Sequence, residues 1–165
     1  MYAERPSFRD VAELHLDDVY AYLVYLTRDR TVAEDLAVET FERALRRWRR
    51  YDPRRASART WLCQLARTVA LDHFRAEERR RRREAAFAPD EVEEGAFGEG
   101  LSPELEQALA RLSAAEREVV VLRVVLELDG AATARLLGIS ETACSTRLSR
   151  ALQKLEREVN ADAVV

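Results

Sequence analysis

The sequence predicts an all-α protein built from two small helical domains. Only five glycines and four prolines occur among its 165 residues, and the abundance of Ala, Leu, Glu and Arg is typical of helical proteins. Apolar residues recur at three- and four-residue steps in two long blocks, as they do in amphipathic helices. An acidic stretch without this period separates the blocks. We therefore expect domains at 1–83 and 104–165, joined by a flexible linker at 84–103.

Three helices are predicted in the first block. Thr31 and Glu34 have the spacing of a capping box, which favours a helix start at Thr31. Ser57 follows the helix-stopping Pro53 and is suited to cap the next helix. The predicted elements are helices at about 7–26, 31–50 and 58–83, with a loop at 51–57. The apolar stripes of these helices comprise Val11, Leu14, Val19, Tyr22, Leu23, Leu26, Val32, Leu36, Phe41, Ala44, Leu45, Trp48, Leu62, Leu65, Ala66, Val69 and Phe74.

The second block predicts four helices. Ser102 and Pro103 form a cap and a first helical position, where proline costs no hydrogen bond. Ser113 and Glu116 form a second capping box, ahead of a helix whose apolar residues are Val119, Val120, Leu122 and Leu126.

The last two helices have the pattern of a helix-turn-helix. Ala134 permits close helix approach, Gly138 suits the positive φ that ends the first helix, and Ser140 is suited to cap the second. A buried stripe is expected on the second helix at Cys144, Leu148, Ala151, Leu152, Leu155 and Val159.

Short hydroxyl side chains and arginines lie outside that stripe. Such a mixture can contact both phosphates and base edges in a major groove. A helical hairpin with a solvated polar face remains the simpler alternative at this point. The residues concerned are Ser140, Thr142, Ser145, Thr146, Arg147 and Arg150.

Charge is unevenly distributed along the chain, although the overall net charge is only −3. Residues 1–83 carry 19 arginines against 14 acidic residues, whereas 84–103 carry six acidic residues and no basic one. Residues 104–165 carry eight basic and ten acidic residues. The overall net charge therefore hides a basic first block, and such asymmetry between segments is itself a clue to function.

Several classes of protein are not favoured by this sequence. No secretory signal is recognisable at the N-terminus and no apolar run is long enough to span a bilayer. We therefore expect a cytoplasmic protein whose two cysteines, Cys63 and Cys144, are buried and reduced. Because no catalytic constellation, glycine-rich phosphate loop or metal-ligand spacing is recognisable, we expect a non-enzyme without a metal or other cofactor.

Three segments together resemble the extracytoplasmic-function (ECF) sigma factors, the minimal two-domain class of bacterial sigma factor. AEDLAVETFERA at 33–44 is similar to the family's AEDLVQETFLRA. YDPR at 51–54, RTWL at 59–62 and ARTVALDHFR at 66–75 are similar to its FDP, FRxWL and IARNLALDxLR motifs. LSAAEREV at 112–119, LLGIS at 136–140 and STRLSRA at 145–151 are similar to its LPxxxREV, LLGIS and VKSRLxRA motifs.

The resemblance implies that the first domain recognises and melts the promoter −10 element. Flipped bases would be captured by loop atoms and aromatic rings, and stacking contributes about 1–3 kcal/mol per base. Trp61 and His73 remain open to a second interpretation as ordinary core residues. The implied −10 residues are Asp52, Arg54, Arg55, Ser57, Arg59, Trp61, Arg67, His73 and Arg75.

The resemblance also implies contacts with core RNA polymerase. The outer face of the second helix would dock on the clamp helices of the largest subunit, and the C-terminal domain on the flap of the second-largest subunit. A plain solvated acidic face is the alternative. The implied polymerase-binding residues are Glu34, Asp35, Val38, Glu39, Glu42, Arg43 and Arg46.

These observations favour a promoter-specificity subunit that reads the −35 element with its helix-turn-helix. The acidic linker would then occupy a basic channel of the polymerase, or serve only as a spacer between domains. An anti-sigma partner is also compatible with the resemblance. The competing interpretation is a stand-alone helix-turn-helix regulator, with N-terminal helices that sense a ligand or form a dimer.

Overall fold

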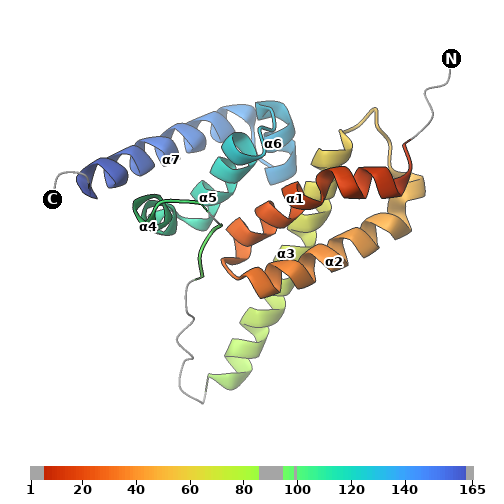
Figure 1. Ribbon diagram of the computed structural model, residues 1–165, viewed down its shortest axis with the longest axis horizontal. Helices are drawn as coiled ribbons and strands as arrows, with labels where there is room; N and C mark the ends of the chain where they lie inside the picture. Colours follow the sequence, from red (N-terminus) through yellow and green to blue (C-terminus); the bar gives the residue numbers. More distant parts are fainter. Residues whose placement is uncertain (1–5, 86–94, 99, 163–165) are drawn as a thin grey trace. The chain divides into compact units, whose positions relative to one another are not determined.

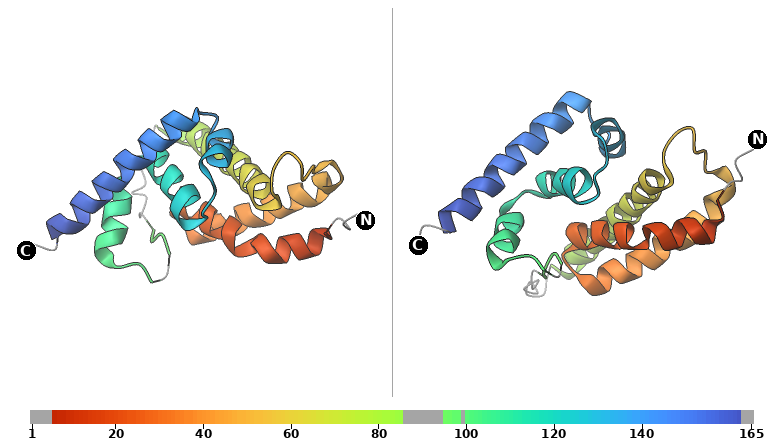
Figure 2. Two further views of the ribbon diagram at one scale, coloured as in Figure 1. Left: turned by 90° about the horizontal axis from the view of Figure 1, so that it is seen from above. Right: turned by 45° about the horizontal axis from the view of Figure 1, so that its top comes forward.

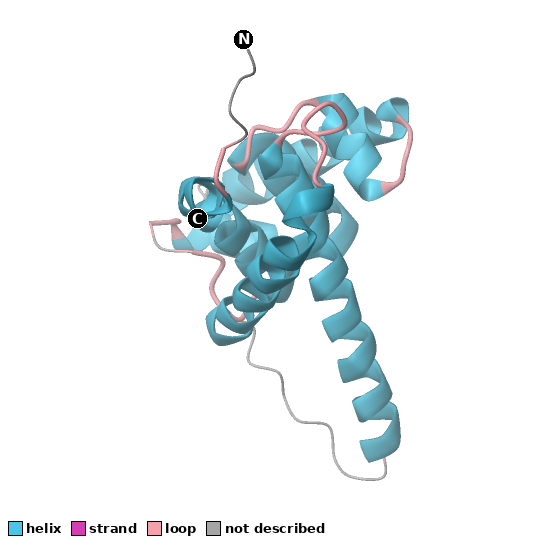
Figure 3. Ribbon diagram, turned by 90° about the vertical axis from the view of Figure 1, so that its right-hand side faces the viewer, coloured by secondary structure: helices cyan, strands magenta, loops and turns pink. Residues whose placement is uncertain are grey.

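A computed structural model of the chain describes residues 6–85, 95–98 and 100–162. All regular structure in these residues is helical (Figure 3), which confirms the predicted fold class. The chain divides into two compact units, one drawn from 1–23 and 27–95 and the other from 24–26 and 96–165. Half of the predicted linker, at 86–94 and 99, lies outside the described residues.

The first unit contains three long helices (Figure 1). They are α1 (Phe8–Thr27), α2 (Arg30–Arg47) and α3 (Ala58–Glu84), with a 3-10 turn, Trp48–Arg50, at the end of α2. α2 and α3 pack against each other. The buried side chains that form this core include Val19, Tyr22, Leu23, Ala33, Leu36, Leu62, Cys63, Ala66 and Val69.

Local capping explains where α2 and α3 begin. The predicted start of α2 at Thr31 is wrong: Asp29 is the N-cap, and its carboxylate accepts a hydrogen bond from the Val32 amide at 3.0 Å. Asp29 has an extended backbone, whereas Thr31 already lies inside the helix. Ser57 caps α3 as predicted, because its hydroxyl accepts a hydrogen bond from the Thr60 amide at 3.1 Å.

Three side chains predicted to face the core of the first unit are exposed instead. Leu45 follows the buried Ala44, and successive helical residues point about 100° apart. Phe74, in the second half of α3, is also exposed. Leu14 of α1 is likewise exposed, at 73%.

Among its described residues, the second unit contains four α-helices, and three of them pack on α7. They are α4 (Pro103–Arg111), α5 (Ala114–Val120), α6 (Gly130–Leu137) and α7 (Glu141–Asp162). α4, α5 and α6 each pack on α7, which is the longest helix of the unit (Figure 2). α5 continues into a π-helical turn, Val121–Val125, where the Leu126 amide donates to the Val121 carbonyl at 2.9 Å.

Both serine caps predicted for this unit are confirmed. The Ser102 hydroxyl accepts a hydrogen bond from the Leu105 amide at 3.2 Å. At α5 the capping box is complete, since Ser113 accepts from the Glu116 amide and the Glu116 carboxylate accepts from the Ser113 amide.

The buried stripe of α7 is narrower than predicted. Cys144, Ala151 and Leu155 are buried, but Leu152 is 41% exposed. Leu152 follows the buried Ala151, and successive helical residues point about 100° apart. Phe97, from the predicted linker, belongs to the core of this unit, with the Arg117 guanidinium 5.0 Å from its ring centre.

None of the helices in the described ranges has the length and apolar character that a membrane span requires. Cys63 and Cys144 are both buried and free. Burial raises the pKa of Cys63 to about 12, with a further rise from Asp18 that Arg59 partly opposes. Burial also raises the pKa of Cys144. Both side chains are therefore protonated thiols at neutral pH.

We expect neither thiol to react with a disulfide reagent such as dithionitrobenzoate at pH 8 while the protein is folded. The thiolate is the reactive form, and both burial and the raised pKa suppress it. The measurement is thiol release with and without denaturant, which should yield two thiols per chain only after unfolding. Rapid release from native protein would contradict the burial of these residues, and Cys63→Ser and Cys144→Ser variants would identify the exposed one.

Candidate nucleic-acid interface

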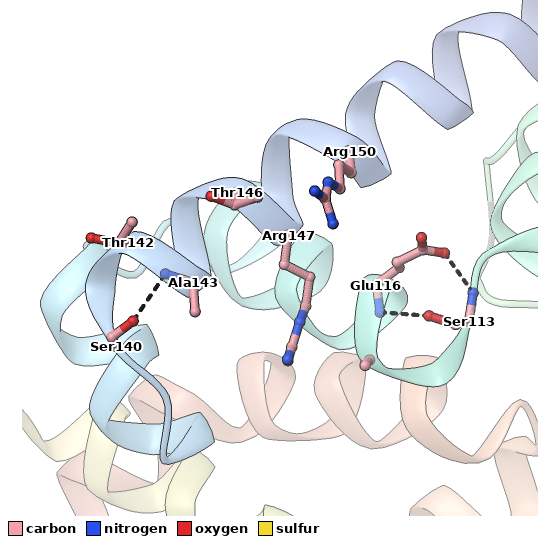
Figure 4. Close-up of a pocket in the computed structure, with 9 residues that line it drawn as sticks. Ser113, Glu116, Ser140, Thr142, Ala143, Thr146, Arg147 and Arg150 are labelled. Atoms are coloured by element: carbon pink, nitrogen blue, oxygen red, sulfur yellow. Dashed lines mark hydrogen bonds between the residues drawn. The ribbon is translucent and has the colours of Figure 1, made fainter.

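A hollow of about 540 Å³ lies between the start of α5 and the first half of α7. It is lined by hydroxyl, arginine and small side chains from both helices (Figure 4). Its lining residues are Ser113, Ala115, Glu116, Ser140, Thr142, Ala143, Thr146, Arg147 and Arg150.

The turn before α7 sets the direction of this helix, and the first half of the helix borders the hollow. Gly138 ends α6 in the left-handed region, with φ of 68°, a conformation that glycine adopts without steric cost. The Ile139 amide then donates to the Ala134 carbonyl at 3.0 Å. Ser140 accepts from the Ala143 amide at 3.1 Å and so caps α7. The helix-turn-helix geometry expected from the sequence is present.

The electrostatics of the hollow favour an anionic ligand. Arg147 and Arg150 project from α7 on the side that faces α5 (Figure 4). The only acidic side chain in the lining is Glu116, and it is already engaged by the Ser113 amide at 2.8 Å and the Lys154 ammonium at 3.3 Å. The Ser113 amide, with a smaller contribution from Lys154, lowers the pKa of Glu116. Because the Glu116 carboxylate is already paired, it competes little with an incoming anion for Arg147 and Arg150.

Five of the six residues predicted for −35 recognition line this hollow, and Ser145 does not. The contribution of α5, through Ser113, Ala115 and Glu116, was missed by the sequence analysis. The sequence signal for this contribution was the capping box of Ser113 and Glu116, because a capping box marks the first turn of a helix. The sequence did not indicate that this turn lies opposite Arg147.

We expect Ser113→Ala to lower the free energy of unfolding by about 1 kcal/mol, the usual value of a serine N-cap. The substitution leaves the Glu116 amide without its partner at the start of a seven-residue helix. Urea denaturation monitored by circular dichroism measures the change. The exposed Ser149→Ala on α7 is the matched control, and an equal effect of both variants would contradict a capping role.

In the first unit, the loop at 51–57 presents charged side chains to solvent. Asp52, Arg54 and Arg55 are exposed. The backbone beneath them is ordered, because the Asp52 carboxylate accepts from the Arg54 amide at 2.9 Å. The Asp52 carbonyl also accepts from the Arg55 amide at 3.1 Å. The loop is thus a defined turn that displays one carboxylate and two guanidinium groups.

The other predicted −10 residues near this loop have structural contacts of their own. Ser57 caps α3, and the Arg59 guanidinium lies 3.7 Å from the Asp18 carboxylate of α1. Trp61 is half-buried within an aromatic cluster, with ring-centre distances of 5.9 Å to Trp48 and 5.0 Å to Tyr51. Trp61 therefore combines a packing role with partial access to solvent.

Arg67, His73 and Arg75 lie further along α3. Arg75 is exposed and pairs with Asp72 at 3.6 Å, while Arg67 and His73 are half-buried. At 1.5 Å rise per residue, the set from Arg59 to Arg75 extends over about 24 Å. The structure therefore divides the predicted −10 residues into a loop group and a helix group. The helix group continues into a shallow basic surface lined by Leu71, Phe74, Arg75, Glu78, Arg79 and Arg82.

The outer face of α2 combines exposed acidic and apolar side chains. Val38 is 61% exposed and Leu45, seven residues later on the same face, is 59% exposed. Glu34, Asp35, Glu42 and Arg46 are exposed around them. An exposed apolar centre with a charged border is typical of a protein-binding surface. Leu45 was missed as a member of this face because the sequence analysis assigned it to the core.

Glu39 and Arg43 of the predicted polymerase face are partly engaged within the first unit. The Arg43 guanidinium donates to the Glu39 carboxylate at 2.5 Å and to the Asp72 carboxylate of α3 at 3.2 Å. Burial lowers the pKa of Arg43, but these two hydrogen bonds outweigh it and raise the pKa above its usual value. Arg43, which is paired with Glu39 on α2, therefore also links α2 to α3 through Asp72.

The described residues contain no cluster of three or more His, Cys, Asp or Glu side chains placed to hold a metal ion. The hollow, the loop at 51–57 with α3, and the outer face of α2 present charge, hydrogen-bond donors and exposed apolar groups. Such surfaces are suited to binding nucleic acid and protein.

Comparison with protein-family models gives two matches that follow the two units. Residues 11–80 match Sigma-70 region 2, and residues 102–155 match Sigma-70, region 4. The first match contains most of α1, α2, the loop and most of α3, and the second contains the hollow.

Curated relatives include several ECF sigma factors. SigC of Mycobacterium tuberculosis is 33% identical over 148 residues, which cover 88% of this chain and 79% of SigC. BldN of Streptomyces coelicolor is 35% identical over 97% of this chain, and the chain spans 63% of the length of BldN. SigX of Bacillus subtilis is 28% identical, with 93% and 84% of the two chains covered.

A similar fold occurs in a solved structure, the sigma factor RpoE of Bartonella quintana in complex with the anti-sigma factor NepR. The TM-score is 0.81 at 22% identity, and 94% of this chain and 98% of RpoE are covered. At this identity the likeness concerns the fold alone.

Proposed function

The chain belongs to the ECF family of RNA polymerase sigma factors, and we propose which of its surfaces performs each step of promoter recognition. The protein binds core RNA polymerase, reads the −35 element with its second unit and opens the −10 element with its first. It has no catalytic step of its own, and it acts in the cytoplasm, where the polymerase is. We propose domains at 1–83 and 104–165, with Phe97 and the Ser102 cap of α4 as linker residues that join the second domain.

The hollow between α5 and α7 is the observation that carries this proposal. It collects hydroxyl groups and two arginines at the start of a capped 22-residue helix. The helix N-terminus and the arginines attract phosphates, while Thr142, Thr146 and Arg147 are suited to base edges. Ser145, outside the hollow, is proposed to contact the DNA backbone beside it.

The loop at 51–57 and the first turns of α3 are proposed to hold unpaired −10 bases. Asp52, Arg54 and Arg55 supply exposed polar groups, and Trp61 supplies a partly accessible ring. Arg67, His73 and Arg75 would lie along the adjoining duplex, where neutralised phosphates add a salt-dependent affinity.

The outer face of α2 is proposed to bind the clamp helices of the largest polymerase subunit. Val38 and Leu45 form its apolar centre, and Glu34, Asp35 and Glu42 complement a basic partner. Glu39, Arg43 and Arg46 border this face. The second unit is proposed to bind the flap of the second-largest subunit, and an anti-sigma factor would compete for these surfaces.

The test is in vitro transcription with sigma-free core polymerase and genomic DNA fragments. The proposal expects that the full chain confers defined start sites that core polymerase alone does not use. The same full chain carrying Arg147→Ala and Arg150→Ala is the control, and it should lose these start sites. Failure of the wild-type chain to direct any start site would refute the proposed function.

The competing function, a stand-alone helix-turn-helix regulator, makes a different prediction. It expects a dimer that binds a palindromic duplex site without polymerase. Gel filtration and binding to forked and fully duplex promoter DNA, each with and without core polymerase, separate the two functions.

A further inference from the structure

A tyrosine, Tyr51, links the two ends of the loop at 51–57. The Tyr51 hydroxyl donates a hydrogen bond to the carbonyl of Ala56 at 3.0 Å. This bond joins the first residue of the loop to its sixth, across the turn that displays Asp52, Arg54 and Arg55. The tyrosine thus closes the loop from its buried side, while the charged side chains face solvent.

The ring of Tyr51 is itself fixed by neighbouring aromatic side chains. It stacks on Trp48 with 5.0 Å between ring centres and 13° between planes. It also contacts Trp61 of α3, again with 5.0 Å between ring centres. Phe8 of α1 packs edge-on against Trp48 at 5.6 Å. These contacts hold the hydroxyl in place from α1, the 3-10 turn and α3.

We propose that Tyr51 is a positioning residue for recognition of the −10 element. Its hydroxyl keeps the loop in one conformation before DNA arrives, so that Asp52 and Arg54 are already placed for unpaired bases. A loop that must become ordered on binding loses affinity and selectivity, because ordering its backbone and side chains costs free energy. This inference rests on the proposed −10 role of the loop.

The test is Tyr51→Phe, which removes the hydroxyl and keeps the ring and its stacking. The full-length variant, bound to core polymerase, is titrated with forked promoter DNA whose −10 non-template strand is unpaired. We expect binding to weaken about 2- to 10-fold, the value of one lost hydrogen bond. Discrimination against a forked DNA with one substituted −10 base should fall by a similar factor.

Two further readouts separate positioning from general stability. Amide hydrogen exchange of the free protein should become faster in residues 52–56 and remain unchanged in the core of α2 and α3. Affinity for core polymerase should stay at the wild-type value. The matched control is Tyr20→Phe on α1, which removes a tyrosine hydroxyl outside the loop and should leave −10 binding unchanged.

Arg54→Ala distinguishes the inference from its premise. This variant keeps the backbone bond from residue 54 to Asp52 but removes an exposed guanidinium. If Arg54→Ala weakens −10 binding while Tyr51→Phe matches wild type in affinity and discrimination, the positioning role of Tyr51 is overturned and the loop's role stands. If both variants bind as wild type does, the proposed −10 role of the loop fails and the inference fails with it.

Discussion

Replacing Val38 and Leu45 together by aspartate is expected to abolish binding to core polymerase. These two residues form the exposed apolar centre of the α2 face. Apolar anchors at the centre of an interface typically contribute 2 kcal/mol or more each, and a buried carboxylate in their place adds a desolvation cost. We therefore expect an affinity loss of about 100-fold or more, measured by fluorescence anisotropy with labelled protein.

The fold should tolerate both substitutions, since neither side chain belongs to the core and changes at exposed positions usually shift stability by less than about 0.5 kcal/mol. Thermal unfolding of the double variant verifies this. The matched control is Leu14→Asp on α1, which places the same charge at another exposed leucine. Unchanged polymerase affinity of the double variant would remove α2 from the proposed interface.

The position of this apolar centre illustrates where sequence reasoning succeeded and where it failed. Val38 was assigned to the outer face, but Leu45 was assigned to the core, although seven residues place them on one face of a helix. The buried residues of α2 are Ala33, Leu36, Ala37, Thr40 and Ala44. Leu36 and Ala44 were assigned to the core correctly, and Leu45 was added to them on the strength of its apolar side chain.

Helix starts were predictable where the signal is local. Ser57, Ser102 and Ser113 each cap the helix that the sequence assigned to them. The exception is α2, where Asp29 and Thr31 both lie close enough to cap. The residue that caps the helix is the one whose backbone stays extended. Whether this is Asp29 or Thr31 depends on the path of the chain after α1, which the capping pattern does not specify.

The features that escaped prediction depend on contacts between distant residues. The π-helical turn at Val121–Val125 has no composition signal, because it depends on how Leu126 and Leu128 re-enter the core. The aromatic cluster joins Phe8, Trp48, Tyr51 and Trp61 from separate elements. The hollow likewise needs α5 opposite α7, so the sequence identified one wall and missed the other.

Arg147→Ala is expected to weaken binding to −35 duplex DNA by about 10- to 100-fold. Arg147 is half-buried on the lining of the hollow, and an arginine that reads a base or a paired phosphate commonly contributes 1–3 kcal/mol. The measurement uses holoenzyme and two duplex fragments, one with the −35 element and one with that element scrambled. The ratio of the two affinities should fall together with the affinity itself.

Arg157→Ala is the matched control for this change. Arg157 is an exposed arginine further along α7, outside the lining of the hollow. Both variants lose one positive charge from the same helix, so a general electrostatic contribution would weaken binding in both. We expect Arg157→Ala to retain the wild-type ratio between the two fragments.

Affinity for core polymerase distinguishes two explanations for weaker DNA binding by Arg147→Ala: loss of a DNA contact, or lower stability of the second unit. A DNA-reading residue should leave that affinity unchanged, because the α2 face belongs to the other unit and Arg147 is proposed to contact DNA rather than the flap. A residue that merely stabilises the second unit should lower polymerase and DNA binding together, with a lower unfolding temperature. Equal losses in both assays would therefore assign Arg147 to the fold and leave −35 recognition to Arg150 and the hydroxyl groups around it.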